Sequence, residues 1–454
     1  MRGKRRGAKN PKRRFSEKTP PQDVIIEHIG AKGDGVATAT FRSYHEDRSR
    51  PVFIPLSLPG EKVSARALHD VGEGVACQLA EIIEASPDRV EPACGHFGAC
   101  GGCGLQHWAP APYQRWKRSR VITALSRIGL EATEVDPLVI AAPGSRRRAE
   151  FVMRRLSGGT VIGFHERGGN HIVDIAECPI LEPELPRIAR SLPPISKELL
   201  APGESARATL NRLDSGSDLL LTLPREPGLS ALESLAEISE KLDLCRISVK
   251  TEKDGASGPV VPVLERRPAM IRFGDVEVNP PPGAFLQATS GGERAIVDAV
   301  LEGVGSSSNI VELHAGCGTL SFNLTRRAKV HAVEGDPTAS ATLERALNRY
   351  RLRNRFSVET RDLADRPLEA AELVAYDALV FDPPRAGARI QAERIATGGP
   401  DRVVAVSCNP ATFARDARIL VDAGYKLARV TPIDQFLWSP HVELVASFYR
   451  GRAA

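Results

Sequence analysis

The chain contains, at residues 309–319, the sequence NIVELHAGCGT, in which a strand-like apolar run leads directly into a glycine-containing loop. A helix is predicted next, over residues 320–327, and a second strand over 330–333. Glycines let the backbone of such a loop approach a ligand closely, and open α/β sheets bind ligands at the carboxyl ends of their strands. The stretch therefore predicts a ligand-binding loop at the edge of a parallel sheet.

The sequence on both sides of this stretch continues the same alternation. Further strands are predicted at 356–359, 378–381, 403–407 and 444–448, and further helices at 295–301, 338–350 and 411–423. Strands that alternate with helices are typical of a parallel sheet covered by helices. We therefore expect a Rossmann-like α/β domain over residues 271–454.

The region before residue 271 predicts three other parts. Short strands with glycine turns at 19–84 favour a small OB-like β barrel. Residues 85–270 predict an α+β central domain, which ends near a Gly/Pro-rich break at 255–262. Residues 1–18 hold nine Lys and Arg side chains against Glu17 alone, which predicts a disordered tail. That tail is either a solubilising appendage or a phosphate-binding arm.

Composition places the chain among ordinary globular proteins. It has 454 residues, 42% hydrophobic and 26% charged, with a net charge of +5. No apolar run approaches the roughly 18 residues needed to span a bilayer, and no apolar stretch follows the N-terminal charges as in a secretory signal. We therefore expect a cytoplasmic protein, and a monomer. Eight cysteines are too few for a disulfide scaffold in a chain of this length.

The carboxylates that follow the predicted strands suit an adenosyl cofactor. Glu334 lies 18 residues past Gly316, where it can accept hydrogen bonds from ribose hydroxyls. A dinucleotide loop would need glycine at Ser321, so a cofactor without a pyrophosphate is favoured, with a structural turn as the alternative. Asp362 is placed to reach an adenine amino group or to cap a helix. Asp382 stands before two prolines that hold it at the crevice.

Cys408 is the candidate nucleophile. The segment Ser407-Cys408-Asn409-Pro410 follows a buried strand at the same sheet edge as the glycine loop. A helix that begins near Ala411 would point its N-terminus at the thiol and favour a thiolate. A free cysteine is more commonly a small core residue, which fits Cys77, Cys245 and Cys317 better than a residue at a crevice edge.

A thiol at this position suits methylation of carbon 5 of uracil. Addition of the thiolate to carbon 6 makes an enolate that places electron density on carbon 5, which then takes the methyl group. A base must afterwards remove the carbon 5 proton so that the cysteine can leave. Glu443, directly before the last predicted strand, is the candidate base, and His441 is its rival.

The order of motifs resembles the RNA uracil-5 methyltransferase family. The motifs are Phe285-Leu286-Gln287, the Gly316 loop, Asp382-Pro383-Pro384-Arg385-Ala386-Gly387, Ser407-Cys408-Asn409-Pro410-Ala411-Thr412 and Asp434-Gln435-Phe436 with His441-Val442-Glu443. The resemblance implies that Cys408 is the nucleophile and Glu443 the base. It also implies that the S-adenosyl-L-methionine site is lined by Gln287, His314, Thr319, Glu334, Asp362 and Asp382. His314 replaces an aromatic residue, Thr319 an Asn, and Asp362 what is often an Asn.

The resemblance extends upstream to the barrel and the clustered cysteines. The barrel at 19–84 is similar to the TRAM domain of many family members. Cys94, Cys100 and Cys103, with Cys178 as a fourth ligand, could bind zinc or an iron–sulfur cluster by spacing alone. Family members with this arrangement carry a 4Fe-4S cluster, so the resemblance implies iron–sulfur.

The expected partner is RNA, with no role for DNA or a membrane. Family members with both the barrel and the cluster tend to act on 23S ribosomal RNA, which makes that the expected substrate by analogy. A tRNA uracil-5 methyltransferase is the nearest alternative, and an RNA-binding assembly factor without catalysis is another. The barrel and the basic tail argue against a DNA or small-molecule methyltransferase.

Overall fold

The computed structural model of the chain describes residues 15–16, 19–42 and 47–451. These residues divide into two compact units. The first holds the described residues up to 98 together with 103–116 and 438–440, and the second holds the remainder. The predicted basic tail lies outside the described residues except at positions 15 and 16. No helix in the described ranges is both long and apolar enough to cross a membrane.

The first unit is built on β strands, as predicted for residues 19–84. Its strands are β1 (Gln22–Ile25), β2 (His28–Ile29), β3 (Gly35–Arg42), β4 (Asp47–Ile54), β5 (Lys62–Val71) and β6 (Gly74–Glu84). They pair in the order β1-β5-β6-β4-β3-β2, antiparallel except for β4 with β6. Within the described residues this pairing leaves β1 and β2 at the two ends, so a closed barrel stays a prediction.

The second unit contains a sheet with helices packed on one face. Its strands are β9 (Arg148–Leu156), β10 (Gly159–His165), β11 (Ile172–Asp174), β12 (Ser205–Leu213), β13 (Gly216–Leu223), β14 (Arg246–Lys253) and β15 (Ala256–Glu265). Their apolar side chains form one core with the helical segments α2 (Glu184–Ala189), η1 (Pro193–Ile195), α3 (Ser196–Leu199) and α4 (Leu229–Lys241). β9 and β10 pair as antiparallel neighbours in this sheet.

The Gly/Pro-rich segment expected to be a break at residues 255–262 is instead most of strand β15. This strand pairs with β14 and stands at the end of the sheet order. An edge strand tolerates proline because one of its sides needs no backbone donor. Pro259 and Pro262 are therefore compatible with the strand, and the ladder with β14 shifts register at two places.

A second sheet in this unit has the predicted Rossmann-like alternation. Its strands are β18 (Asn309–Leu313), β19 (Lys329–Glu334), β20 (Phe356–Thr360), β21 (Ala378–Phe381), β22 (Arg402–Ser407), β23 (Lys426–Asp434), β24 (Glu443–Tyr449), β7 (Glu134–Val135) and β8 (Val139–Ile140). The order is β20-β19-β18-β21-β22-β24-β23-β7, and β8 also pairs with β23. The first five in this order are parallel, whereas β24 runs antiparallel to β22. Residues 134–140 join this sheet although they precede the expected domain start at 271.

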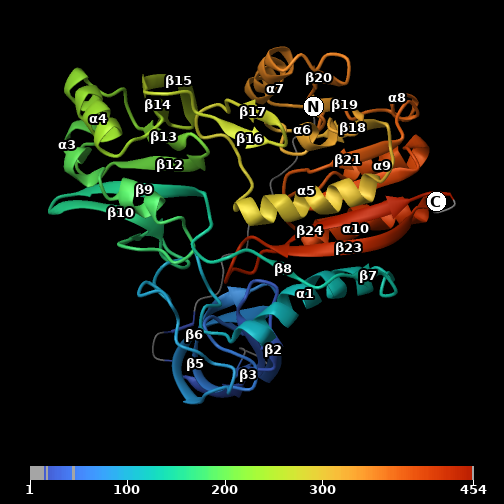
Figure 1. Cartoon of the computed structure of the whole chain (residues 1–454). Helices are drawn as coiled ribbons and strands as arrows, with labels where there is room; N and C mark the ends of the chain where they lie inside the picture. The colour runs from blue at the N-terminus through green and yellow to red at the C-terminus, as the bar shows by residue number, and fades with distance from the viewer. Residues whose placement is uncertain (1–14, 17–18, 43–46, 452–454) are drawn as a thin grey trace, which may run out of the picture. The chain divides into compact units, whose positions relative to one another are not determined.

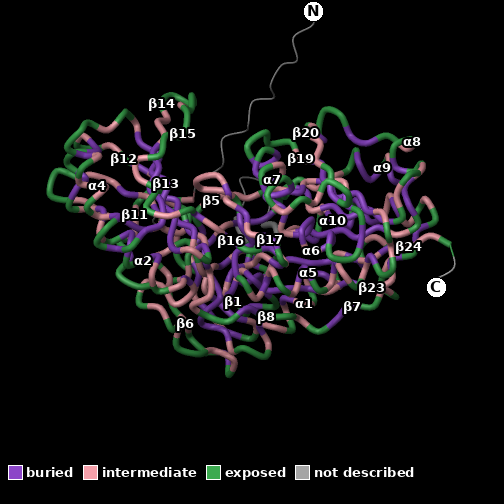
Figure 2. Tube along the Cα trace, turned by 45° about the horizontal axis from the view of Figure 1, so that its top comes forward, coloured by how far each residue is buried: buried purple, intermediate pink, exposed green. Residues whose placement is uncertain are grey.

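Alternate residues of the central strands face two different cores. In β21, Ala378 and Val380 belong to one core, and Leu379 and Phe381 to the other. The first core contains α5 (Ser290–Val304), α6 (Ser321–Leu324), α7 (Pro337–Arg349) and the hairpin β16 (Ile271–Phe273)–β17 (Val276–Val278). The second contains α8 (Ala370–Leu373), α9 (Arg389–Gly398), α10 (Pro410–Asp422) and the second half of α1 (Pro110–Ser126). Figure 1 shows α5 running alongside β23 and β24, and Figure 2 shows buried residues along the inner segments of the trace and exposed residues mainly in its outer loops.

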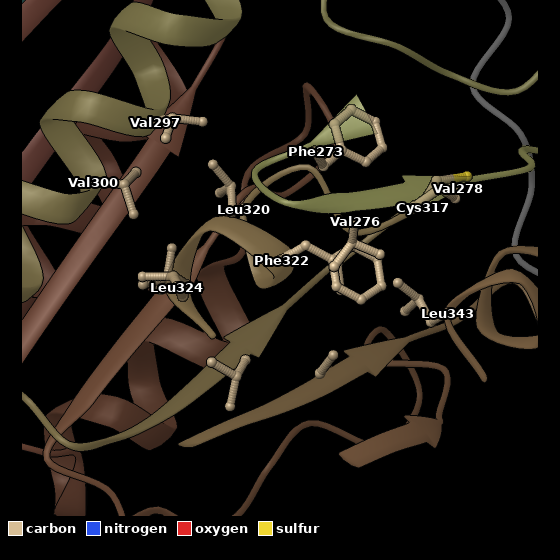
Figure 3. Close-up of a cluster of buried hydrophobic side chains, with 14 of the residues drawn as sticks. Phe273, Val276, Val278, Val297, Val300, Cys317, Leu320, Phe322, Leu324 and Leu343 are labelled. Carbon is tan, nitrogen blue, oxygen red and sulfur yellow. The ribbon is translucent and has the colours of Figure 1, made fainter. Parts of the chain in front are cut away.

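The first of these cores packs directly beneath the glycine loop. Figure 3 shows Phe322 pointing into the cluster close to Val276 and Leu343. Gly318 has φ +96°, and a Cβ atom there would lie 2.4 Å from the Phe322 ring. Glycine at this position therefore allows the loop to close over the aromatic ring.

Candidate active site

A cavity of about 560 Å³ lies at the carboxyl ends of β18, β19, β21 and β22. This volume is in the range of about 300–1,000 Å³ that is usual for small-molecule and cofactor sites. The predicted site residues that line the cavity are Gln287, His314, Thr319, Glu334, Asp382, Cys408 and Glu443. Asp362 is not among the lining residues; its carboxylate instead accepts a bond from the Ala364 N–H at 2.9 Å, as in a local turn.

The glycine loop is fixed to the neighbouring strand by a carboxylate. The N–H of Gly316 donates to Oε2 of Glu334 at 2.7 Å, and Oε1 of Glu334 accepts from the N–H of Asp336 at 2.8 Å. Gly316 has φ +55°, and a Cβ atom there would meet nothing within 4 Å. The loop therefore presents bare backbone to the cavity, as close approach to a ligand requires.

His314 begins the loop with a backbone conformation that is unusual for a side chain with a Cβ, at φ +62°. Strained conformations of this kind cluster at ligand-binding sites. Burial lowers the pKa of its imidazole, while Glu334 and Asp362 act in the opposite direction. We therefore expect a neutral, flat ring on the cavity wall.

Cys408 and Glu443 face each other because of the strand pairing. Ser407, the last residue of β22, pairs with Leu444 in the antiparallel ladder with β24. In an antiparallel ladder the residue after Ser407 lies opposite the residue before Leu444, so Cys408 lies opposite Glu443. Both line the cavity, so the predicted nucleophile and base occur in one site.

The electrostatic environment of Cys408 differs from the sequence expectation of a favoured thiolate. The helix α10 does begin at Pro410, and Asn409 caps it by accepting from the N–H of Ala411. Burial nevertheless raises the pKa of the Cys408 thiol, as do the carboxylates of Glu443 and Asp382, while Arg385 lowers it. The thiol is therefore the favoured form, and an acceptor must take its proton before attack.

Two carboxyl groups of the site, those of Glu443 and Asp382, are held by side-chain amides. Nε2 of Gln435 donates to Oε2 of Glu443 at 3.0 Å, and Nε2 of Gln287 donates to Oδ2 of Asp382 at 3.2 Å. Burial raises the pKa of Glu443 to about 8, with the Asp382 charge adding to the effect, and burial raises that of Asp382 to about 6. A carboxyl group with a raised pKa is suited to accept a proton near neutral pH.

His441, the rival base, has the opposite character. Burial lowers the pKa of its imidazole to about 4, and Arg385, Lys117, Arg120 and Arg146 lower it further. It is not among the residues that line the cavity. Its low basicity and its position favour Glu443 as the base.

Three residues of this region were not singled out by the sequence. Glu312 lines the cavity from within β18, and burial raises its pKa to about 8. Gln435 is 1% exposed and contacts Glu443. Lys117 is fully buried and donates to Oδ1 of Asp434 at 2.7 Å. A lone acid inside an apolar strand was a signal for Glu312, Gln435 stood in the quoted Asp434-Gln435-Phe436 motif without a role, and nothing marked Lys117.

Comparison with known proteins places the chain in a family. The model of the family described as tRNA (Uracil-5-)-methyltransferase matches residues 282–448. An uncharacterized RNA methyltransferase of Rhizobium meliloti (strain 1021) is 42% identical over 93% of this chain and 98% of its own length. One from Brucella suis biovar 1 (strain 1330) is 40% identical over 94% and 98%. The chain belongs to the RNA uracil-5 methyltransferase family.

A solved structure agrees with this family at the level of the fold. The Pyrococcus abyssi tRNA (uracil-54, C5)-methyltransferase, crystallised with S-adenosyl-L-homocysteine, superimposes with a TM-score of 0.73. It covers 94% of this chain and 99% of its own, at 24% identity. The chain therefore has the Rossmann-like S-adenosyl-L-methionine methyltransferase fold, and the bare loop at Gly316 with the carboxylate of Glu334 fits such a cofactor.

The four cysteines expected to hold iron and sulfur do not form a metal site in the described residues. There, no three His, Cys, Asp or Glu side chains are grouped so that they could hold a metal ion. Cys94 and Cys103 belong to the first unit, and Cys100 and Cys178 to the second. The iron–sulfur cluster therefore stays a prediction. Cys77, Cys245 and Cys317 are buried, as expected for core cysteines.

Proposed function

We propose that this protein methylates carbon 5 of a uracil in RNA, with Cys408 as the covalent nucleophile and Glu443 as the general base. The observation that carries the proposal is the occurrence of both residues in one cavity with the Gly316 loop. S-adenosyl-L-methionine, when bound, supplies the methyl group. His314, Thr319 and Glu334 are proposed to line its site, and Asp362 is a weaker candidate because it lies outside the cavity lining.

The side chains of the cavity provide the remaining chemistry. Cys408 loses its proton to the Asp382 carboxylate, which leaves Glu443 free for the later step, and the sulfur adds to carbon 6 of the uracil. After carbon 5 has gained the methyl group, Glu443 takes the carbon 5 proton. The electron pair of that C–H bond forms the carbon 5–carbon 6 double bond, and the sulfur leaves with the electrons of the broken carbon–sulfur bond. Both carboxyl groups with raised pKa are therefore used to move protons.

The proposed substrate is 23S ribosomal RNA, with tRNA as the alternative. The analogy with family members that carry a TRAM domain and an iron–sulfur cluster supports the ribosomal choice, and both features remain proposals for this chain. The family description and the Pyrococcus protein name tRNA, which supports the alternative. Mass mapping of methyluridine in ribosomal RNA and tRNA from a deletion strain would distinguish them.

The covalent step is tested with RNA that contains 5-fluorouridine, which has no removable proton at carbon 5. The wild type should form a protein–RNA complex that survives denaturing electrophoresis, and Cys408→Ala should not. Cys245→Ala is the matched control. Cys245 is also buried, but its thiol lies outside the cavity and donates a hydrogen bond to the backbone carbonyl of Ser217. A complex formed equally well by Cys408→Ala would contradict the assignment, and its absence in the wild type would contradict the mechanism.

A further inference from the structure

Gln435 is the first residue of the connection between β23 and β24, and both the oxygen and the nitrogen of its side-chain amide form hydrogen bonds. Its Oε1 accepts from the backbone N–H of Ala288 at 3.0 Å. Its Nε2 donates to Oε1 of Gln287 at 2.8 Å and to Oε2 of Glu443 at 3.0 Å. A primary amide nitrogen has two N–H donors, so no donor remains. At 1% exposure, this side chain is held in one place.

The orientation of this amide follows from the backbone. The N–H of Ala288 can only donate, so the atom that faces it must be the oxygen of Gln435, and the nitrogen must face Glu443. The same logic then orients Gln287, whose oxygen faces Gln435 and whose nitrogen faces Asp382. Each of the two carboxyl groups therefore receives one amide N–H, and neither amide can turn over without setting donors against donors.

This arrangement gives the two oxygens of Glu443 different roles. Within the described residues, Oε2 takes the bond from Gln435, and Oε1 receives none, so Oε1 remains for the substrate. A hydrogen bond to a carboxylate favours its ionised form, which is the form that can accept a proton.

The charged and titratable groups around Glu443 and Gln435 come from several elements. Asp382 and Cys408 directly follow β21 and β22, and Asp434, which ends β23, pairs with Lys117 of α1. Glu312 of β18 and Arg385 line the same cavity. The Arg147–Glu293 pair adjoins Gln287 from the side of α5. The Asp382 charge raises the pKa of Glu443, and the N–H of Gln435 is a neutral donor that opposes this effect.

We propose that Gln435 is a positioning residue for removal of the carbon 5 proton, an inference that rests on the proposed function. Through the bond to Oε2 it favours the ionised form of the carboxylate and leaves Oε1 to take the proton. Oε1 gains the proton, the C–H electron pair becomes the carbon 5–carbon 6 double bond, and the Cys408 sulfur leaves carbon 6 with its electron pair. Gln435 itself neither gains nor loses an atom in this step.

The test is Gln435→Met, which keeps the length of the side chain and removes its polar atoms. Gln391→Met is the matched control. Gln391 is also buried, but it lies outside the cavity, where its amide accepts from the Leu368 N–H and donates to the Leu368 carbonyl. Single-turnover reactions use RNA with tritium at carbon 5 of uridine and a labelled methyl group. Tritium release reports proton removal, and label in the RNA reports methyl transfer.

Loss of the bond should slow tritium release about tenfold at pH 7, the effect of about one pKa unit. The pH of half-maximal release should rise by about one unit, covalent adduct should accumulate, and the rate of methyl transfer should be unchanged. Gln391→Met should keep the wild-type pH profile. A structural role alone would lower both rates without moving the pH midpoint, and an unmoved midpoint in Gln435→Met would overturn the proposal.

A second variant covers the case in which Gln435→Met does not fold, as judged by circular dichroism. Gln435→Glu keeps the shape but places another acid beside Glu443, so the midpoint should again rise, and a wild-type midpoint would overturn the proposal. The 5-fluorouridine experiment on the wild type tests the proposed function independently of the inference on Gln435. If it forms the 5-fluorouridine adduct while both Gln435 variants keep its pH profile, only the inference on Gln435 fails.

Discussion

Replacement of Glu443 by Gln should lower activity and raise stability at the same time. The change keeps the size of the side chain and an oxygen that can accept from Gln435, but removes the ability to take a proton. Loss of a general base typically costs about 10²–10⁴-fold in rate. Attack by Cys408 and methyl transfer should continue, so covalent adduct should accumulate with ordinary uridine RNA.

The stability gain follows from the pKa of the buried carboxyl group. Burial raises it from 4.5 to about 8, so the folded state keeps its proton over a range in which the unfolded state has lost it. The wild type therefore loses stability as the pH rises from 4.5 to 8, by up to about 1.4 kcal/mol per unit. By pH 7 the accumulated loss in the free energy of unfolding is roughly 3 kcal/mol, and Glu443→Gln is expected to regain this amount.

The assay is urea denaturation of both proteins at pH 5 and pH 8. The difference in the free energy of unfolding should be small at pH 5 and should grow toward pH 8. Glu233→Gln, at an exposed position on α4, is the control and should give no such trend. A difference that does not depend on pH would refute the electrostatic reasoning. Normal turnover by Glu443→Gln would move the base to His441 or to water.

Three further predictions concern the rest of the chain. Lys117→Met breaks an ion pair in which both side chains are 0% exposed, so the free energy of unfolding should fall by about 3–5 kcal/mol. Arg418→Met, in the exposed pair with Asp422, should change it by less than about 0.5 kcal/mol, and equal losses would contradict this. Protein purified without oxygen should be brown and hold about four irons, whereas colourless protein with one zinc would leave the zinc alternative. Deletion of residues 1–18 should weaken RNA binding and flatten its salt dependence without a change of target uridine, and an unchanged salt slope would make the tail a solubilising appendage.

The parallel part of the sheet could be predicted because its strands are buried on both faces. Such strands are mainly apolar runs, so 309–313 and 378–381 could be predicted with the bounds that the structure gives. The residues after these strands were found for a related reason. Parallel strands end at one edge, so chemically active residues that follow different strands are expected to meet there.

Features that depend on distant contacts could not be predicted. Strands of two residues, such as 134–135, are too short to produce a pattern, and only pairing with β23 defines them. Lys117 belongs to a helix rich in Arg and Lys, where nothing local separates a buried cation from exposed ones. The pKa of Cys408 was misjudged because the sequence shows the helix that follows it, but not the carboxylates that fold against it.

The reversed direction of β24, which the predicted parallel sheet did not include, explains how the base comes to this site. Glu443 is the first residue of β24, so in a parallel strand it would lie at the edge opposite Cys408. β23 runs in the same direction as the parallel strands and brings the chain to the carboxyl edge at Asp434, and β24 then starts from that edge. Antiparallel pairing with β22 sets Leu444 against Ser407, and hence the base against the nucleophile. The same turn places Gln435 one residue after β23, where its amide reaches Glu443. The reversed strand thus supplies both the base and the side chain that orients it.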